Sequence, residues 1–394
     1  MNVHPCTDAL KPILPDFEKL TGAKVTMEEV SWGELVKKLP IELSSGRPSF
    51  DVFMLNHCYP LEYARAGWVA PLDKYLNDPT LTDASWYDFA DYPFGSYALQ
   101  MVDGKLYGIP IANDNQILFY RKDIFADHGI EVPYTMDEMY DAGVAIKTDD
   151  MAGIAIRMKR GTGASWTWNG YVLDYGGMWI DPNNRVFLNS PQTVAGTEMY
   201  IKQAQDAGPE GALSYGWYEC YNSFMQGKAA MLPDASIFVG AFSDPEQSAV
   251  VGKVGFAELP ASPSGHRQPN AGNAWALAVP ADAPNDKAGW LFVQWATSKK
   301  RSLEEVSISG AACRNSVWDS EELRQMFPEE WINVAHGQMV KYGATYWFPE
   351  VKGISKAMDI VDVAMQQIYT GEYTAQEALD RAHEETEKLL AKYE

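Results

Sequence analysis

The feature that most constrains the fold is an alternation of short apolar or β-branched runs with amphipathic helical segments through the first half of the chain. The runs 24–30, 50–55 and 106–111 have the patterns of half-buried or fully buried strands. Between them, apolar residues recur every three or four positions, as they do on one face of a helix. Strands that alternate with helices predict parallel pairing, with helices on both faces of the sheet. The chain is therefore predicted to have an α/β fold.

Helix starts and ends are also readable from local signals. The apolar stripe from Leu10 to Leu20 predicts a helix, and Pro12 and Pro15 within it predict a bend. Capping-box spacing predicts three further helix starts, at Ser31 with Glu34, Thr135 with Glu138 and Thr374 with Glu377. In the second half we predict helices over 191–207, 286–297 and 354–368, strands over 229–232, 254–259 and 274–279, and a loop over 261–273.

Length and charge narrow the class of protein. A chain of 394 residues exceeds the size at which a single core stops growing, so two or more cores are expected. With 32 basic and 53 acidic residues the net charge is −21, which repels phosphate backbones and disfavours nucleic acid as a partner. No apolar run is long enough to predict a transmembrane helix. The 13 tryptophans and 21 tyrosines must pack a core, line a ligand site, or both.

Motifs of catalysis and metal binding are missing from the sequence. The four cysteines form no C-x-x-C pair, and the histidines do not cluster, which disfavours a zinc or redox site. There is no G-x-S-x-G, G-x-x-x-x-G-K-[ST] or H-E-x-x-H. A glycosidase pair of carboxylates stays open, because Asp and Glu are plentiful and their spacing favours no pair.

Polar and aromatic residues gather at the predicted strand ends. The runs 56–59 and 113–116 each follow a strand, and Asn273 opens a later one. Ligands of open α/β sheets bind beyond the carboxyl ends of the strands. Amide and carboxylate side chains such as those of Asp114 and Gln116 match the donors and acceptors of a polyhydroxylated ligand. Trp166 and Trp168 can cover the C–H face of such a ligand.

Each of these residues also has a purely structural interpretation. The run 113–116 can be a turn whose side chains bond their own backbone. Trp166 and Trp168 stand two apart, so in a strand they share a face and can both be core. The remaining structural alternatives are a hydrogen-bonding role for His57, an inward-packed helix stripe of Trp217, Tyr218 and Tyr221, and a surface charge at Arg314, which follows the small residues of 310–313.

Several stretches, taken in order, resemble the extracellular solute-binding proteins of ABC sugar importers, the family that includes the maltose-binding protein. The stretches are FEKLTG at 17–22, SG at 45–46 before DVF at 51–53, LYGIP at 106–110 with LFYRKD at 118–123, FMQGKAAM at 224–231, DPEQS at 244–248, GKVGF at 252–256, and 274–280, 290–298 and 375–382. The resemblance covers nearly the whole chain, and its specificity comes from the order and spacing of the pieces. Two departures are an unusually polar 113–116 run and a first strand that is cut short.

The resemblance implies a two-lobed periplasmic-binding-protein fold of type II. Each lobe would hold a mixed, mostly parallel sheet flanked by helices, and a hinge would join the lobes. The expected N-terminal lobe is 1–112 plus 273–318, and the expected C-terminal lobe is 113–272 plus 319–394.

The resemblance also suggests which residues bind ligand in the cleft between the lobes. It places Asp114 just past the first crossover, Asn56 and His57 on a first-lobe loop, Trp166 on an aromatic loop of the second lobe, and Asp234 after a strand. Trp217 falls where some members stack an aromatic ring on the ligand. The sugar-alcohol branch of the family further suggests Asn273, Trp275 and Arg314. With Gln116 and Trp168 from the strand-end argument, these are the expected ligand contacts.

The expected function is capture of a small carbohydrate or sugar alcohol outside the cytoplasm and its delivery to an ABC transporter permease, by a monomer with no cofactor or metal. One alternative is a glycosidase that uses Asp114 and Asp234, and another is a binder of cationic solutes. A ligand-loaded partner of a sensor would use the same fold and site. If the protein is exported, Cys6 and Cys58 can form a disulfide; the alternative is two free thiols. No signal peptide is visible at the start of the sequence.

Overall fold

A computed structural model describes residues 1–161, 163–271, 273–343 and 348–393, and the chain divides into two compact units. Unit 1 comprises Met1–Asp114, Ile237–Gly240 and Gly272–Pro328, and unit 2 comprises Asn115–Ser236, Ala241–Ala271 and Glu329–Glu394. The chain was expected to cross between the lobes after residues 112, 272 and 318. The units change after 114, 271 and 328, and unit 1 also takes 237–240.

Unit 1 is built from short helices around a three-stranded sheet and a small hairpin. Its helices are α1 Pro5–Leu10, α2 Leu14–Thr21, α3 Trp32–Ser44, α4 Pro60–Arg65, α5 Asp73–Leu76, α6 Ala84–Tyr87, α7 Phe94–Tyr97, α14 Asp286–Ala296, α15 Lys299–Ser309, α16 Asn315–Trp318 and α17 Glu321–Met326. Its strands are β1 Phe53–Asn56, β2 Met101–Val102, β3 Lys105–Leu106, β4 Ile109–Asp114 and β9 Asn273–Ala278. The short helix α13, Val239–Phe242, straddles the boundary between the units.

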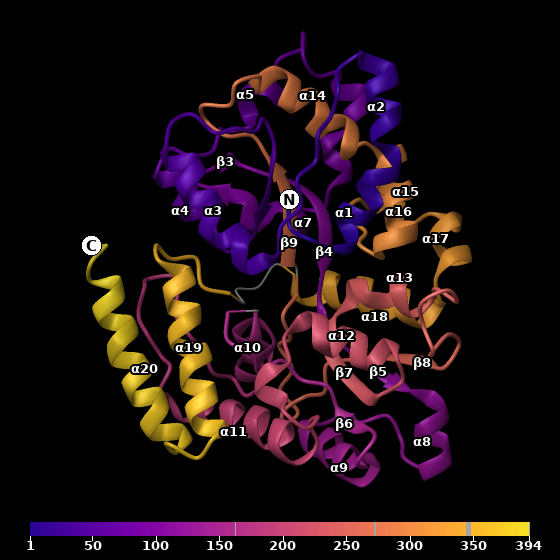
Figure 1. Cartoon of the computed structure of the whole chain (residues 1–394), viewed down its shortest axis with the longest axis vertical. Helices are drawn as coiled ribbons and strands as arrows, with labels where there is room; N and C mark the ends of the chain where they lie inside the picture. The colour runs from indigo at the N-terminus through magenta and orange to yellow at the C-terminus, as the bar shows by residue number, and fades with distance from the viewer. Residues whose placement is uncertain (162, 272, 344–347, 394) are drawn as a thin grey trace. The chain divides into compact units, whose positions relative to one another are not determined.

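The sheet of unit 1 has the order β1-β9-β4, so a late segment of the chain lies between two early ones. Strand β9 is antiparallel to both neighbours, with Phe53 opposite Ala278 in β1 and Asp114 opposite Asn273 in β4. Figure 1 shows the orange β9 beside the violet β4. Because β9 runs the opposite way, its first residues lie at the same end of the sheet as the last residues of β1 and β4.

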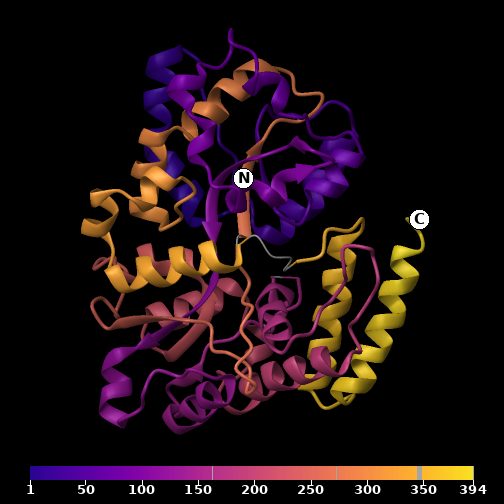
Figure 2. The same cartoon turned by 180° about the vertical axis from the view of Figure 1, so that it is seen from behind.

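Unit 2 has longer helices around a four-stranded sheet. Its helices are α8 Lys122–His128, α9 Met136–Ile146, α10 Ala164–Asp174, α11 Pro191–Asp206, α12 Trp217–Met225, α18 Glu329–Tyr342, α19 Ile354–Tyr369 and α20 Ala375–Leu390. Its strands are β5 Gln116–Arg121, β6 Ala152–Ile154, β7 Ala229–Ala235 and β8 Val254–Glu258. The sheet order is β6-β7-β5-β8. The yellow α19 and α20 pack side by side in both Figure 1 and Figure 2.

The prediction of mostly parallel pairing is wrong for these sheets. Strand β5 is antiparallel to both β7 and β8, and β9 is antiparallel to β1 and β4; among the described strand pairs only β6 and β7 run parallel. The alternation of strands and helices constrains only the relative direction of strands that follow one another in the sequence. The segments that complete each sheet come from far along the chain, and their direction is not encoded locally.

Most of the predicted elements are confirmed. The helices over 191–207, 286–297 and 354–368 correspond to α11, α14 and α19, and the bend near Pro12 is a 3₁₀ turn, Lys11–Ile13, between α1 and α2. The predicted strand over 24–30 is an exception. Within it only Val30 forms a bridge, parallel to Asn2. Among the described residues, no helix is both long and apolar enough to cross a membrane.

Candidate functional site

Polar strand ends meet at one end of the sheet in unit 1. Asn56 is paired with Trp275 across β1 and β9, and Asp114 is paired with Asn273 across β4 and β9. The N–H of His57 donates to the carbonyl of Ala274 at 3.0 Å. Asn56, His57 and Asp114 therefore come together, as sequence reasoning expected, beside the backbone at the start of β9. The side chain of Asn273 lies outside the described part of the structure.

The turn after β1 orders two of these side chains. Asn56 Oδ1 accepts a hydrogen bond from the backbone N–H of Cys58 at 3.1 Å, and His57 Nε2 lies 3.2 Å from Cys58 Sγ. Both Asn56 and His57 are buried. The contact with Cys58 fits the structural interpretation of His57. The hydrogen bond of Asn56 involves only its Oδ1 atom, and its Nδ2 group takes no part in it.

The buried amide of Asn113 stands out in the polar run after β4. Neither its Oδ1 nor its Nδ2 has a hydrogen-bond partner among the described residues. Buried polar atoms in folded proteins nearly always have a partner, so this amide has one donor group and one acceptor to offer a ligand. The run is not a simple turn, because Asn113 and Asp114 end β4 and Gln116 begins β5. Asn115 Nδ2 donates to the carbonyl of Ala335 at 2.6 Å, and Gln116 Nε2 donates to the carbonyl of Thr167 at 3.0 Å.

An aromatic cluster lies at the same end of the unit 1 sheet. The ring of Trp275 packs against His4 at a centroid distance of 5.0 Å and edge-on against Trp32 at 5.2 Å. Sequence reasoning missed both partners. Trp32 directly follows the helix cap Ser31 and His4 directly precedes α1, so each reads as an ordinary helix-start residue. Only the fold brings them to Trp275.

In unit 2 the expected residue Asp234 forms a buried ion pair with Arg157. Arg157 Nε donates to Asp234 Oδ2 at 2.8 Å, and its Nη2 donates to Oδ1. Burial would lower the pKa of Arg157, but the Asp234 carboxylate outweighs it and the pKa is raised. The guanidinium lies over the ring of Trp166 at 5.2 Å, and Trp166 Nε1 is buried without a hydrogen-bond partner in the described part of the chain. Arg157, Trp166 and Asp234 thus form one polar and aromatic group.

The other basic side chains near this group are also paired. Lys159 Nζ lies 3.0 Å from Glu219 Oε1, and Arg160 Nη2 donates to Asp359 Oδ2 at 3.0 Å. The basic run over 157–160 is therefore compensated by carboxylates and does not present a patch of net positive charge.

Two expected ligand contacts in unit 2 are core residues. Trp168 lies on helix α10, and its Nε1 donates to Thr197 Oγ1 at 2.9 Å in a fully buried environment. Gln116 is also fully buried, and its Oε1 accepts from Asn270 Nδ2 at 3.0 Å. A side chain at Gly170 would collide with this Gln116 amide, so the glycine permits the close approach. The structure corrects both assignments to structural roles.

Arg314 is corrected in the same way. All five of its N–H groups donate within unit 1, to the carbonyls of Thr297, Asp88 and Tyr87 and to the carboxylate of Asp91. Its guanidinium is fully buried and lies 4.1 Å from the ring centre of Tyr92. Since no donor remains for a ligand, Arg314 holds loops together. It is neither a ligand contact nor the surface charge of the alternative interpretation.

Trp217 is the first residue of α12 and is partly exposed. Its ring packs edge-on against Tyr218 at 5.5 Å and lies 6.3 Å from Tyr221. The three rings form the stripe that the alternative interpretation described, but Tyr218 is 56% exposed, so the stripe is not packed inward as a whole.

All four cysteines are buried and lie outside any disulfide, so Cys6 and Cys58 are not joined. Cys6 Sγ lies 2.9 Å from His4 Nδ1, and burial raises the pKa of this thiol well above its ordinary value. Within the described residues, no three His, Cys, Asp or Glu side chains are grouped so that they could hold a metal ion.

The chemistry of these groups is that of binding. Asp114 and Asp234, the carboxylates of the glycosidase alternative, belong to different units, and both oxygens of Asp234 are engaged by Arg157. Unit 1 offers spare amide hydrogen bonds beside aromatic rings, and unit 2 offers a neutralised ion pair beside Trp166.

Comparisons with known proteins agree with this assignment. The family model for bacterial extracellular solute-binding proteins matches residues 6–301. An erythritol/L-threitol-binding protein of Mycolicibacterium smegmatis is 27% identical over 98% of this chain and 84% of its own length. A probable amino-acid ABC transporter periplasmic-binding protein of Sinorhizobium fredii is 25% identical over 93% of this chain and 84% of its own length.

A solved structure of an ABC transporter solute-binding protein from Agrobacterium radiobacter in complex with ribitol has a TM-score of 0.91 and is 26% identical, covering 98% of this chain and 97% of its own. The two-lobed α/β architecture is that of type II periplasmic binding proteins, and proteins of this kind bind solutes for ABC importers and are not enzymes. The chain belongs to the family of bacterial extracellular solute-binding proteins.

Proposed function

We propose that this chain captures a small, neutral, acyclic polyol outside the cytoplasm and delivers it to the permease of an ABC transporter. The observation that carries the proposal is the buried amide of Asn113 in unit 1, which has no hydrogen-bond partner among the described residues. A hydroxylated ligand supplies both the donor and the acceptor that this amide lacks. The compensated basic run of unit 2 favours a neutral ligand over an anionic one.

The relatives support the ligand class. One is named for erythritol and L-threitol, and one similar solved structure, with a TM-score of 0.91, is in complex with ribitol. All three compounds are sugar alcohols without a ring: erythritol and L-threitol have four carbons, and ribitol has five. Such a ligand offers adjacent hydroxyls to amide and carboxylate groups, and its C–H edges can lie against the rings of Trp166 and Trp275.

The proposal assigns ligand contacts to residues of each unit: Asn56, Asn113, Asp114 and Trp275 from unit 1, and Arg157, Trp166 and Asp234 from unit 2. Trp217, partly exposed on α12, is retained as a further stacking contact. We also propose that the protein acts as a monomer, which light scattering of the purified chain tests directly.

Titration calorimetry and thermal shift across a panel of solutes test the ligand class. We expect erythritol and ribitol to bind and to raise the melting temperature, because ligand at about 100 times its Kd stabilises the folded state by about 2.7 kcal/mol. Glucose, an amino acid such as glutamine, and choline serve as the ring-sugar, amino-acid and cationic members of the panel. Binding of glutamine or choline in preference to every alditol would overturn the proposal.

Substitutions locate the contacts. Asn113→Ala is expected to weaken alditol binding at least tenfold, the equivalent of one lost hydrogen bond to a buried group. Asn77→Ala is the matched control, since Asn77 lies exposed in the same unit after α5. Equal affinity in the two variants would remove Asn113 from the site.

A further inference from the structure

Helix α10 carries Trp166 in its first turn and has no cap of its own. Its N-cap residue is Gly163, which has no side chain, and its first turn contains no acidic residue. The first N–H groups of a helix have no partner within the helix, and an N-cap side chain usually accepts one of them. The start of α10 therefore depends on another part of unit 2 for an acceptor.

Asp362 of helix α19 supplies that acceptor. Its Oδ1 atom accepts a hydrogen bond from the N–H of Ser165 at 3.0 Å, and its Oδ2 atom accepts one from the N–H of Gly161 at 2.8 Å. Ser165 is the second residue of α10, the position that an N-cap side chain normally serves, and a negative charge is favourable at this end of a helix. Figures 1 and 2 show α10 beside α19.

Two further side chains of α19 hold the segment that leads into α10. Asp359 accepts two hydrogen bonds from the guanidinium of Arg160, and Gln366 Nε2 donates to the carbonyl of Met158 at 3.2 Å. Because they lie three and four positions from Asp362, all three side chains share one face of the helix. This face of α19 therefore fastens the chain at several points before Trp166.

The carboxylate of Asp362 is costly where it lies. Asp362 is 2% exposed, and burial raises the pKa of its carboxyl group to about 7, although the N–H groups of Gly161 and Ser165 lower it. A buried carboxylate destabilises the fold unless its hydrogen bonds compensate, so packing alone would be served better by an apolar side chain. The two N–H groups that it accepts are what the carboxylate adds.

We propose that Asp362 is a positioning residue for ligand binding, which fixes the first turn of α10 and thereby sets where the ring of Trp166 meets the solute. This role rests on the proposed function, in which Trp166 contacts the ligand. The N–H of Trp166 donates to the carbonyl of Gly163 at 3.2 Å, so the ring moves with the turn that Asp362 holds. A contact side chain that is held in place before the ligand arrives need not be ordered on binding.

A double-mutant cycle with ribitol tests whether Asp362 acts through Trp166. We expect Asp362→Ala to weaken ribitol binding about fivefold or more in calorimetry, and to change it less than about twofold in a Trp166→Ala background, where the positioned ring is absent. Thr374→Ala is the matched control, because it removes the N-cap of α20 and costs stability but should leave the affinity unchanged. An equal loss of affinity from Asp362→Ala in both backgrounds would overturn the proposal.

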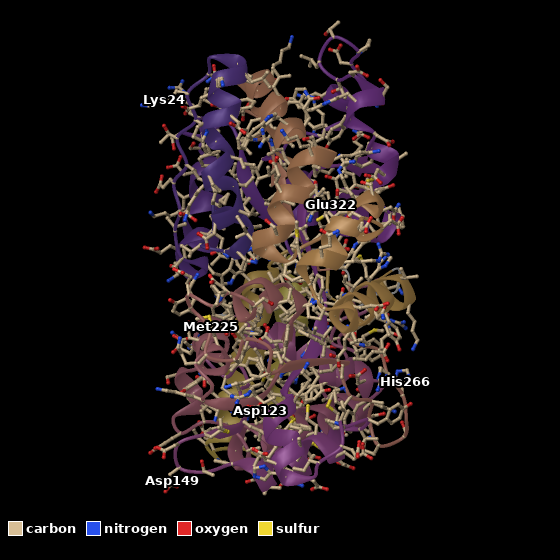
Figure 3. All side chains as sticks on the ribbon, turned by 90° about the vertical axis from the view of Figure 1, so that its right-hand side faces the viewer. Lys24, Asp123, Asp149, Met225, His266 and Glu322 are labelled. Carbon is tan, nitrogen blue, oxygen red and sulfur yellow. The ribbon has the colours of Figure 1, made fainter. Side chains whose placement is uncertain are left out.

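Hydrogen exchange in the ligand-free protein tests the anchor without any solute. We expect Asp362→Ala to speed amide exchange over 163–168 about tenfold or more. Asp149→Ala should leave it unchanged, since Asp149, labelled in Figure 3, is an exposed carboxylate in the loop between α9 and β6. Unchanged exchange in Asp362→Ala would overturn the positioning role alone. A wild-type protein that binds neither ribitol nor erythritol would overturn the proposed function alone.

Asp362→Asn repeats the test in a variant that keeps the shape of the side chain and removes a buried charge, so it should be as stable as the wild type. Its amide nitrogen replaces one of the two accepting oxygens. We therefore expect ribitol to bind about threefold more weakly and exchange over 163–168 to quicken. Wild-type affinity together with wild-type exchange in this variant would overturn the role of the carboxylate.

Discussion

A buried amide in unit 1 and a buried ion pair in unit 2 differ in whether their hydrogen bonds are satisfied within the chain. In unit 1, Asn113 is buried with both amide atoms unpartnered among the described residues. In unit 2, Arg157 and Asp234 satisfy each other through two hydrogen bonds, and Asn270 links Gln116 to Trp166. The Asn113 amide of unit 1 therefore has unused hydrogen-bonding capacity, whereas the Arg157–Asp234 pair of unit 2 is already satisfied, although Trp166 Nε1 beside it has no partner among the described residues. An unsatisfied group costs stability until a ligand completes it, and a satisfied one gives rigidity.

The largest effect is expected from breaking the ion pair of unit 2. Asp234→Leu leaves the Arg157 guanidinium buried without its partner, and removal of one member of a buried pair costs about 3–5 kcal/mol. Replacement of both residues, with Arg157→Met, should recover most of that loss. Denaturant unfolding measures both values. Glu384→Gln, which breaks an exposed pair with Lys388, is the control and should cost well under about 1 kcal/mol. A double variant no more stable than Asp234→Leu would contradict the interpretation.

In unit 1 a substitution is expected to raise stability and to weaken ligand binding. Asn113→Leu removes two unsatisfied polar atoms, so it should stabilise the ligand-free protein by about 1 kcal/mol while weakening alditol binding at least tenfold. Asn270→Leu is the informative counterpart, because Asn270 is fully hydrogen-bonded and its loss should destabilise unit 2. Unfolding and calorimetry of the two variants together test the contrast. Destabilisation by both substitutions would remove the difference between the units.

Stability is expected to depend on pH through Glu305, a fully buried residue on α15 of unit 1. Burial raises the pKa of its carboxyl group well above the ordinary value, and Oε1 has no hydrogen-bond partner among the described residues. The folded state then holds a proton that the unfolded state releases, so this group lowers stability as pH rises above its unfolded pKa of about 4.3.

Glu305→Gln removes that titration. The variant should resemble the wild type near pH 4.5 and should exceed it at pH 8 by about 1.4 kcal/mol or more, the equivalent of one pKa unit. Unfolding curves at the two pH values, with exposed Glu384→Gln as control, measure the difference. A gap between variant and wild type that stays constant with pH would show that Glu305 does not titrate in this way.

The smallest effect concerns salt. The ion pairs indicate that the basic run of unit 2 is compensated. The affinity for a neutral alditol should therefore change less than about twofold between 0.05 and 0.5 M salt, although the Debye screening length falls steeply over that range. Arg160→Gln should likewise leave the affinity unchanged. A strong salt dependence of Kd would show that a charged ligand or an uncompensated patch takes part.

Helices and strands whose signals lie within one helical turn or one strand could be predicted from the sequence. The spacing of Ile354, Met358 and Val361 predicts α19, and the capping boxes at Thr135 and Thr374 mark the starts of α9 and α20. The expected gathering of Asn56 and Asp114 also followed from their positions at strand ends, and the structure places them at one end of the sheet.

What depends on distant partners could not be predicted. Arg314 follows small residues that suggested a cleft edge, yet five hydrogen bonds to segments up to 227 positions away fix it in the core. Trp168 has the sequence context of Trp166, but Thr197 on α11 takes its N–H. The local sequence indicates that a polar side chain needs a hydrogen-bond partner. Only the tertiary fold determines whether the protein or a ligand supplies that partner.

The insertion of β9 between β1 and β4 has a consequence for the order of events during synthesis. The early strands of unit 1 do not pair with each other, and the strand that joins them ends at residue 278. At 5–20 residues per second, roughly 8–33 s pass between the synthesis of β4, which ends at residue 114, and that of β9. Through that time the apolar edges of β1 and β4 stay unmatched, and their pairing then closes very long loops, which slows folding. The sheet of unit 1 thus cannot close until residue 278 has been made, and unit 2 waits longer still for its last segment, 329–394.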